Sequence, residues 1–286
     1  MDELYLKVSE ITKQGLYTFM KEEKISTLNY HFCYYFDHCI DENQIQVISH
    51  HFSNHKIEGL TVIDELGISF SYEKDNPITK QHFTLCHELG HYILKHDGNY
   101  FTESIDNQEN LLEREANIFS AIVLMPDIVL LSKIYYSCDT FHQVQNSLEV
   151  SKQALFFRLL DFLREYYFGK DSEIKQAVET YIEGNNASIY CLFHDVREQI
   201  IEEFHQFQPS LINQVKQRVS KLGFTTSKEY PDLLNQDNWK AIKAENINFK
   251  TWLIYNKGKS IAYVWDKEKF SDEEARKKAE IQLLLM

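Results

Sequence analysis

Two histidines and a glutamate lie close together in the stretch HELGHYI. His87 and His91 are four residues apart, and Glu88 directly follows the first histidine. Residues i and i+4 of an α-helix share one face, so both imidazoles can point at one metal ion. A carboxylate beside such a pair can act as a general base. The spacing therefore indicates a hydrolytic metal site, with His87 and His91 as ligands and Glu88 as the catalytic residue.

The residues around this motif predict a buried helix over about residues 79–95. One sector of the helix carries Thr84, the two histidines and Glu88, and apolar side chains fill most of the rest. Such a helix is typical of a protein interior. Buried imidazoles and carboxylates are costly unless they are paired or bound to metal. The alternative is a chance motif whose histidines are satisfied by other side chains.

A third ligand is expected because catalytic zinc usually has three protein ligands. The next predicted helix covers residues 109–124. Its buried stripe consists of Leu112, Ala116, Phe119, Ile122 and Val123. At 100° per residue, Glu115 lies about 40° from the centre of the stripe, Glu113 about 120° and Glu109 about 80°. We therefore predict Glu115 as the third ligand of a Zn²⁺ ion and expect Glu113 to be solvated. The alternative for Glu115 is a surface glutamate at the edge of the core.

The segments before the motif predict a helix and a hairpin. An amphipathic helix is expected over residues 2–22 and two short strands over residues 57–74. The second strand, GISFSYE at residues 67–73, precedes the histidine helix by a short connection. If it is an edge strand, a substrate backbone can pair with it.

The segments after the motif predict two further parts. Residues 127–170 are helical throughout, with a helix-turn-helix-like break, but their charges balance, whereas a DNA-reading helix is normally basic. Residues 171–286 predict a separate α+β domain with a strand at 187–193 and a hairpin at 249–270. We expect this domain to act in sensing, docking or oligomerisation.

Composition narrows the classes of function. The net charge of −13 argues against a general binder of nucleic acid or anionic membranes, and no apolar run looks long enough to span a bilayer. The five cysteines are scattered without a CxxC pair, which favours free thiols. The N-terminus lacks the features of a signal peptide. These observations together favour a cytoplasmic protein.

Two motifs together resemble a known family. The runs QHFTLCHELGHYILKH and EREANIFSAIVLMP are similar to the ImmA/IrrE family of bacterial and phage metallopeptidases. His87, Glu88 and His91 match its HExxH positions, and Glu115 matches the Glu of its Glu-Ala-Asn element. His82 and Cys86 stand where Arg and Ala are commoner, and neither change removes a ligand. The resemblance covers about residues 57–126 and extends weakly beyond them.

The resemblance implies a zincin-like metallopeptidase. We predict an α+β fold with this domain at residues 1–126, a helical helix-turn-helix-like unit at 127–170 and the C-terminal domain at 171–286. The implied activity is that of a zinc endopeptidase whose protein substrate is a DNA-binding repressor, cleaved to switch on stress, phage or mobile-element genes. Two alternatives stay open: a non-proteolytic regulator that keeps the zinc site, and a DNA-binding factor with a relic peptidase fold.

Overall fold

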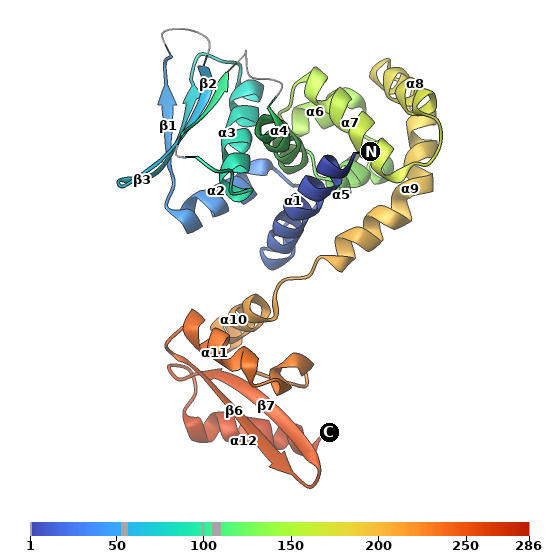
Figure 1. Ribbon diagram of the computed structural model, residues 1–286. Helices are drawn as coiled ribbons and strands as arrows, with labels where there is room; N and C mark the ends of the chain where they lie inside the picture. Colours follow the sequence, from blue (N-terminus) through green and yellow to red (C-terminus); the bar gives the residue numbers. More distant parts are fainter. Residues whose placement is uncertain (1, 53–56, 99, 105–109, 286) are drawn as a thin grey trace. The chain divides into compact units, whose positions relative to one another are not determined.

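The chain folds into two compact units. The computed structural model describes residues 2–52, 57–98, 100–104 and 110–285, and the units are Met1–Gln208 and Pro209–Met286. Both units contain helices and a sheet, so the expected α+β class is confirmed (Figure 1).

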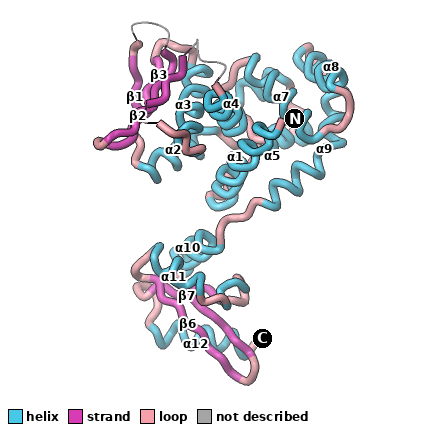
Figure 2. The backbone as a smooth tube through the Cα atoms, in the orientation of Figure 1, coloured by secondary structure: helices cyan, strands magenta, loops and turns pink. Residues whose placement is uncertain are grey.

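The first unit begins with two helices and a four-stranded sheet and continues as a run of helices (Figure 2). Its elements are α1 (Glu3–Glu22), α2 (Phe32–Asn43), β1 (Gln46–His50), β2 (Ile57–Asp64), β3 (Gly67–Glu73), α3 (Ile78–Ile93), β4 (Tyr100–Ser104), α4 (Leu111–Leu124), α5 (Asp127–Leu130), the π-helix η1 (Leu131–Tyr136), α6 (Phe141–Ser147), α7 (Lys152–Tyr166), α8 (Asp171–Ile182) and α9 (Ala187–Gln206). The predicted N-terminal helix, hairpin and two motif-bearing helices are therefore confirmed.

The sheet has the strand order β1-β3-β2-β4. β3 pairs with β1 in parallel and with β2 in antiparallel register, so the expectation that GISFSYE is an edge strand was wrong. The second strand of a hairpin can still gain a neighbour on its other side from an earlier segment, and here β1 is that neighbour. The described edges of the sheet are β1 and β4.

Helix α3 lies between the sheet and α4 (Figure 1). One of its faces contacts the strands, and the other packs along α4. The helix ends at Ile93, and Lys95 then takes a left-handed conformation with φ of 57°. Because it is covered on both sides, even its polar residues His87, Glu88 and His91 are buried.

A buried ionic cluster joins four helices of the first unit. The ammonium of Lys13 lies 2.6 Å from Asp127, 2.7 Å from Glu165 and 3.1 Å from Glu203, on α5, α7 and α9. Arg158 pairs with the second oxygen of Asp127. Buried charges are tolerated when each has a partner of opposite sign. The cluster ties α9 to the N-terminal helix.

Residues 187–193, predicted as a strand, form the first turns of α9 instead. A run of seven mostly apolar residues is too short to distinguish the 3.6-residue period of a helix from the two-residue period of a strand. The longer series Ile189, Phe193, Val196 and Ile200 recurs at helical spacing and is buried in the main core. The boundary between units therefore lies at residues 208/209 and not at 170/171, because α8 and α9 pack into the first unit.

One helical run is more apolar than expected. Among the described residues, only the run Leu111–Tyr136 is long and apolar enough to cross a membrane, and 89% of its most apolar window is buried. This corrects the sequence reading that no segment reaches that length. Burial inside the unit is what a core helix of this composition requires.

The second unit is a three-stranded antiparallel sheet covered on both faces. Its elements are α10 (Leu211–Leu222), β5 (Phe224–Thr226), the 3₁₀-helix η2 (Pro231–Leu234), α11 (Asp237–Glu245), β6 (Phe249–Asn256), β7 (Lys259–Asp266) and α12 (Asp272–Leu284). The strand order is β5-β7-β6, and β6–β7 is the predicted hairpin. Alternate residues of β7 face two hydrophobic clusters, one with α10 and α11 and one with α12.

Glu165 is a carboxylate of the ionic cluster whose ionised form is disfavoured by its surroundings. Burial would raise the pKa of Asp127, but Lys13 and Arg158 hold it at about 2. Burial and the charge of Asp127 raise the pKa of Glu165 to about 7, although Lys13 opposes this shift. The folded chain therefore keeps a proton on Glu165 at pH values where the unfolded chain has lost it.

We predict that the Glu165→Gln variant loses part of the pH dependence of stability. A raised folded pKa means that stability falls as pH rises from about 4.5 to about 7 and is level above that range. The contribution of Glu165 to this fall is on the order of 3 kcal/mol at most. Urea unfolding of both proteins between pH 4.5 and 8 measures it. The control is Glu198→Gln, an exposed glutamate of α9. A stability difference between the wild type and Glu165→Gln that does not change with pH would contradict the assignment.

Candidate metal centre

Helix α3 brings its two motif histidines together. The Nε2 atoms of His87 and His91 are 3.0 Å apart, and both residues are 1% exposed. Cys86 and Leu89 lie on the opposite side of the helix in the hydrophobic core. The helical spacing therefore places both imidazoles on one side, as expected from the sequence.

The third group beside them is Glu113. Its carboxylate oxygens lie 3.1 Å from His87 Nε2 and 3.6 Å from His91 Nε2, and the residue is 9% exposed. A tetrahedral ion with ligand distances of 2.0–2.1 Å holds its ligand atoms about 3.3 Å apart. The three observed separations bracket this value. His87, His91 and Glu113 therefore fit a metal ion and form the metal group.

Glu115, the predicted third ligand, lies outside this group. Its carboxylate accepts a hydrogen bond from Nε2 of His96 at 2.9 Å. The prediction assumed a single buried stripe on α4, but this helix packs against α3 on one side and α1 on another. The face toward α3 carries Glu113, Ala116 and Ser120, which contact His87, Gly90 and Phe83 respectively. The centre of the overall stripe was therefore the wrong reference direction.

Hydrogen bonds at Nδ1 orient both imidazoles. His87 Nδ1 lies 3.0 Å from Oδ1 of Asn117, and His91 Nδ1 lies 2.8 Å from Nδ1 of His96. When Nδ1 carries the proton in each ring, Nε2 has a free lone pair for a metal. Glu115 then acts through His96, as the end of a chain that holds His91 in place.

Burial favours the neutral imidazoles of His91 and His96. It lowers the pKa of His91 to about 3, and the neighbouring His87 and His96 add to this effect. Burial also lowers the pKa of His96, against the opposing influence of Glu115. Neutral imidazole is the form that binds metal.

Glu88 points from α3 toward the sheet. It is fully buried, and Thr61 of β2 donates a hydrogen bond to its Oε2 at 2.5 Å. A Cβ at Gly59 would lie 2.3 Å from Oε1 of Glu88, so only glycine leaves room for the carboxylate there. Two alternate residues of one strand thus fix the side chain next to the metal group.

The close packing of α3 and α4 depends on Gly90. A Cβ at this position would lie 3.1 Å from the Phe119 ring and 3.2 Å from the Cα of Ala116. Ser120 also donates a hydrogen bond to the carbonyl of Phe83 at 2.9 Å across the same interface. The small residues let the helices approach until Glu113 reaches the histidines.

Strand β4 reaches the metal group through Phe101. Its ring stacks on His91 with centroids 4.7 Å apart and an interplanar angle of 17°. The backbone of β4 pairs with β2 on one side only among the described strands. An edge strand therefore lies directly beside a metal-group histidine.

The sequence reading missed Glu113, Asn117, His96 and Thr61. Glu113 and Asn117 are four residues apart on α4, and Ala116 and Ser120 lie between and beyond them. This stripe of small and polar residues was the available signal, because it marks a helix face that meets a polar partner closely. The roles of His96 and Thr61 had no comparable local signal.

Comparison with known proteins agrees with the motifs. Residues 41–160 match a peptidase family model described as the IrrE N-terminal-like domain. No curated protein and no solved structure matches the chain. The resemblance to the ImmA/IrrE family is thus confirmed for a segment that includes the whole metal group, and a peptidase type of function follows.

We predict that Glu113→Gln weakens metal binding more than Glu115→Gln. The first variant removes a ligand, whereas loss of an outer partner typically costs about 10–100-fold in affinity. Zinc titration against a chelator of known affinity measures both. Glu65→Gln, in the exposed β2–β3 turn, is the control. The opposite order would restore Glu115 as the ligand.

We also predict that Gly90→Ala lowers zinc affinity, by about tenfold, while alanine itself favours the helix. The added methyl pushes α4 away from α3 and Glu113 away from the histidines. The same titration measures the effect. Ile78→Ala, at the exposed start of α3, is the control. Unchanged affinity in Gly90→Ala would show that the helix spacing does not limit the site.

Proposed function

We propose that the IrrE N-terminal-like domain of this chain is a zinc-dependent endopeptidase that cleaves a regulatory protein, such as a helix-turn-helix repressor. The observation that carries the proposal is the convergence of three buried side chains: the Nε2 atoms of His87 and His91 are 3.0 Å apart, and the two carboxylate oxygens of Glu113 lie 3.1 Å from the first and 3.6 Å from the second. Two histidines and one glutamate are the ligand set of hydrolytic zinc sites. The buried Glu88 beside them supplies the base, and the arrangement as a whole is zincin-like.

The roles of the residues follow from their positions. A zinc ion bound here supplies Lewis acidity toward the scissile carbonyl. Glu88 accepts a proton from the attacking water and passes it to the leaving amine. The hydroxyl of Thr61 and the space left by Gly59 hold that carboxylate in one orientation. Asn117 and the His96–Glu115 pair keep both imidazoles in the tautomer that presents Nε2.

The substrate backbone is proposed to pair with β4. Among the strands that the structure describes, β4 is an edge of the sheet, and Phe101 on it stacks on His91. Addition of an extended peptide to an exposed strand provides backbone hydrogen bonds without fixing the side chains. The scissile bond is then held next to the metal group.

The net charge supports a basic partner. The chain carries −13, and a DNA-binding repressor has a positive surface that complements it. The same negative charge is also explained by solubility alone. The identity of the partner therefore has to come from an experiment. We place the activity in the cytoplasm, which the free state of all five cysteines supports.

We predict that Glu88→Gln keeps zinc but lowers cleavage by about 10²–10⁴-fold, because it removes the base and leaves the ligands. New protein N-termini, identified by mass spectrometry in cells that express each form, reveal the substrate and the rate. Glu65→Gln is the matched control on the exposed turn.

The same experiment separates the alternatives. If cleavage persists in Glu88→Gln, the peptidase mechanism is wrong. If no substrate is cleaved by either form and the biological output is the same, the chain acts as a non-proteolytic regulator. A metal-free protein whose thermal stability ignores chelators would exclude both.

A further inference from the structure

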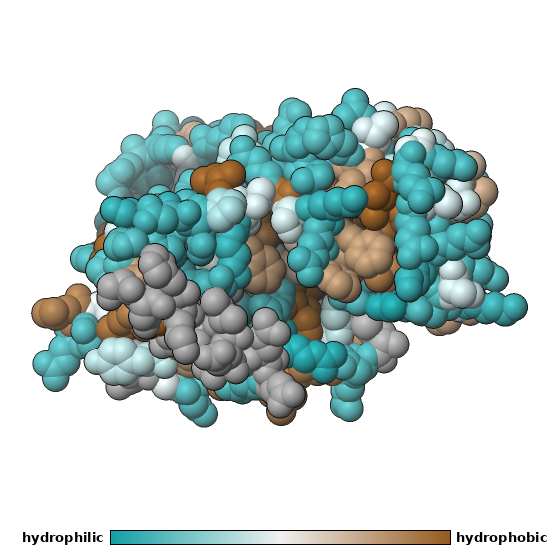
Figure 3. Space-filling view, turned by 90° about the horizontal axis from the view of Figure 1, so that it is seen from above, coloured by the Kyte–Doolittle hydropathy of each residue, from teal (hydrophilic) through white to brown (hydrophobic). Residues whose placement is uncertain are grey.

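A pocket adjoins the metal group on the side of His87. It has a volume of about 500 Å³ and lies among the start of α1, α3, α4 and α7. Its apolar walls include Phe83, Ile118, Ala121, Ala154 and Phe157. Volumes of this size accommodate large side chains or small ligands. Viewed from above, hydrophilic residues cover most of one face, and hydrophobic residues surface in a hollow near its centre (Figure 3).

Two residues connect this pocket to the metal group. Asn117 lines the pocket and also bonds to Nδ1 of His87 at 3.0 Å. Phe83, one turn before His87 on α3, lines it too, with the two ring centroids 6.3 Å apart. Only the imidazole of His87 therefore separates the pocket wall from the ligand atom Nε2. A side chain of a peptide held at the metal group would have to pass beside this imidazole to enter the pocket.

Each arginine that lines the pocket already has a carboxylate partner, and the partner of the buried Arg158 is Asp127. Arg114 pairs with Asp2, and Arg164 lies 2.6 Å from Asp171 and 3.3 Å from Asp161. A charged ligand would have to displace one of these partners. The apolar walls, by contrast, favour an apolar ligand. Phe157 is 52% exposed, and a ligand that removes its ring from water is stabilised by the hydrophobic effect. The chemistry of the pocket favours an uncharged, apolar group.

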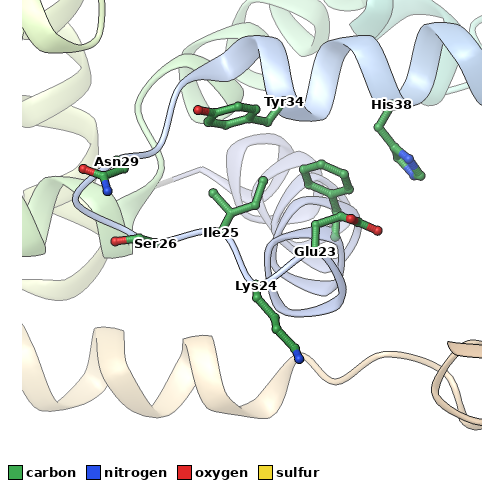
Figure 4. A pocket seen from close by; sticks show the side chains of 8 residues that line it. Glu23, Lys24, Ile25, Ser26, Asn29, Tyr34 and His38 are labelled. Atoms are coloured by element: carbon green, nitrogen blue, oxygen red, sulfur yellow. The ribbon is translucent and has the colours of Figure 1, made fainter. Parts of the chain in front are cut away.

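A larger pocket of about 680 Å³ lies elsewhere, between the end of α1 and the start of α2. Figure 4 shows Ile25 and Tyr34 side by side there and Lys24 pointing away from them. Its walls come from α1, α2 and the segment between them. Among the described residues that line it, none is a member of the metal group or a hydrogen-bond partner of its histidines.

We propose that the pocket beside His87 is a substrate subsite that selects a large apolar side chain, preferably aromatic, next to the scissile bond. An aromatic group in it contacts Phe83 and Phe157, and aromatic pairs add to the gain from burial. This inference rests on the proposed peptidase function and adds its specificity. It explains why Phe157 stays exposed: the substrate covers it.

The test uses the zinc-loaded full chain and three peptide hydroxamates that differ in one side chain: methyl, isobutyl or benzyl. The hydroxamate binds zinc, and calorimetry reports affinity without turnover. The benzyl compound should bind roughly 10- to 100-fold tighter than the methyl compound, as expected for burying that group. In Ala154→Phe, which fills the pocket, the preference should fall below about threefold while the methyl compound keeps its affinity.

Two further variants complete the design. Ala187→Phe adds the same side chain at the exposed start of α9 and should leave the preference unchanged. Phe157→Ala removes an exposed wall, so it keeps the proposal testable if Ala154→Phe does not fold. It should weaken binding of the benzyl compound and leave the methyl compound unaffected.

The outcomes separate the two proposals. Equal affinity for all three compounds in the wild type, or a preference that survives Ala154→Phe and Phe157→Ala, overturns the subsite while zinc and hydroxamate binding still support the peptidase. If no hydroxamate binds the zinc-loaded protein, the proposed function fails and the subsite falls with it.

Discussion

The close contact between α3 and α4 is the constraint on which the site depends. Gly90 lies against Ala116 and Phe119 with no room for a Cβ at ordinary distance. Helices separated by larger side chains would leave Glu113 out of reach of His87, whose Nε2 it approaches to 3.1 Å. The glycine of the HELGH motif is therefore a packing residue, and its absence of a side chain sets the geometry of the metal group.

Because α3 lies in the interior, the polar side chains of the site are shielded from water, and each of them needs a hydrogen-bonding or ionic partner. Its polar residues are out of water, where each unsatisfied group costs free energy. Partners from three other elements meet this need: Thr61 on β2, Asn117 on α4, and His96, which follows α3 and bonds to Glu115. The same partners fix side-chain orientation, so stability and preorganisation have a common source.

The ionic cluster around Lys13 serves the site indirectly. It joins α1, α5, α7 and α9 behind α4, and α1 and α7 contribute walls to the pocket beside His87. Breaking a buried pair leaves an uncompensated charge, which strongly destabilises a fold. The pocket is thus supported by charges that take no part in the proposed chemistry.

The spacing of residues along the sequence was enough to predict features that lie within a single helix or hairpin. His87, Glu88 and His91 share one helix, so the 3.6-residue period alone placed them, and the hairpin at 249–266 likewise followed from local alternation. The tertiary structure decided what depends on a second element. It chose Glu113 over Glu115, because a helix buried on two sides has no single inward direction, and it made β3 an interior strand by pairing it with β1. Residues 187–193 are helical for the same reason. At the helical period, Ile189, Leu192 and Phe193 all lie in the main hydrophobic core.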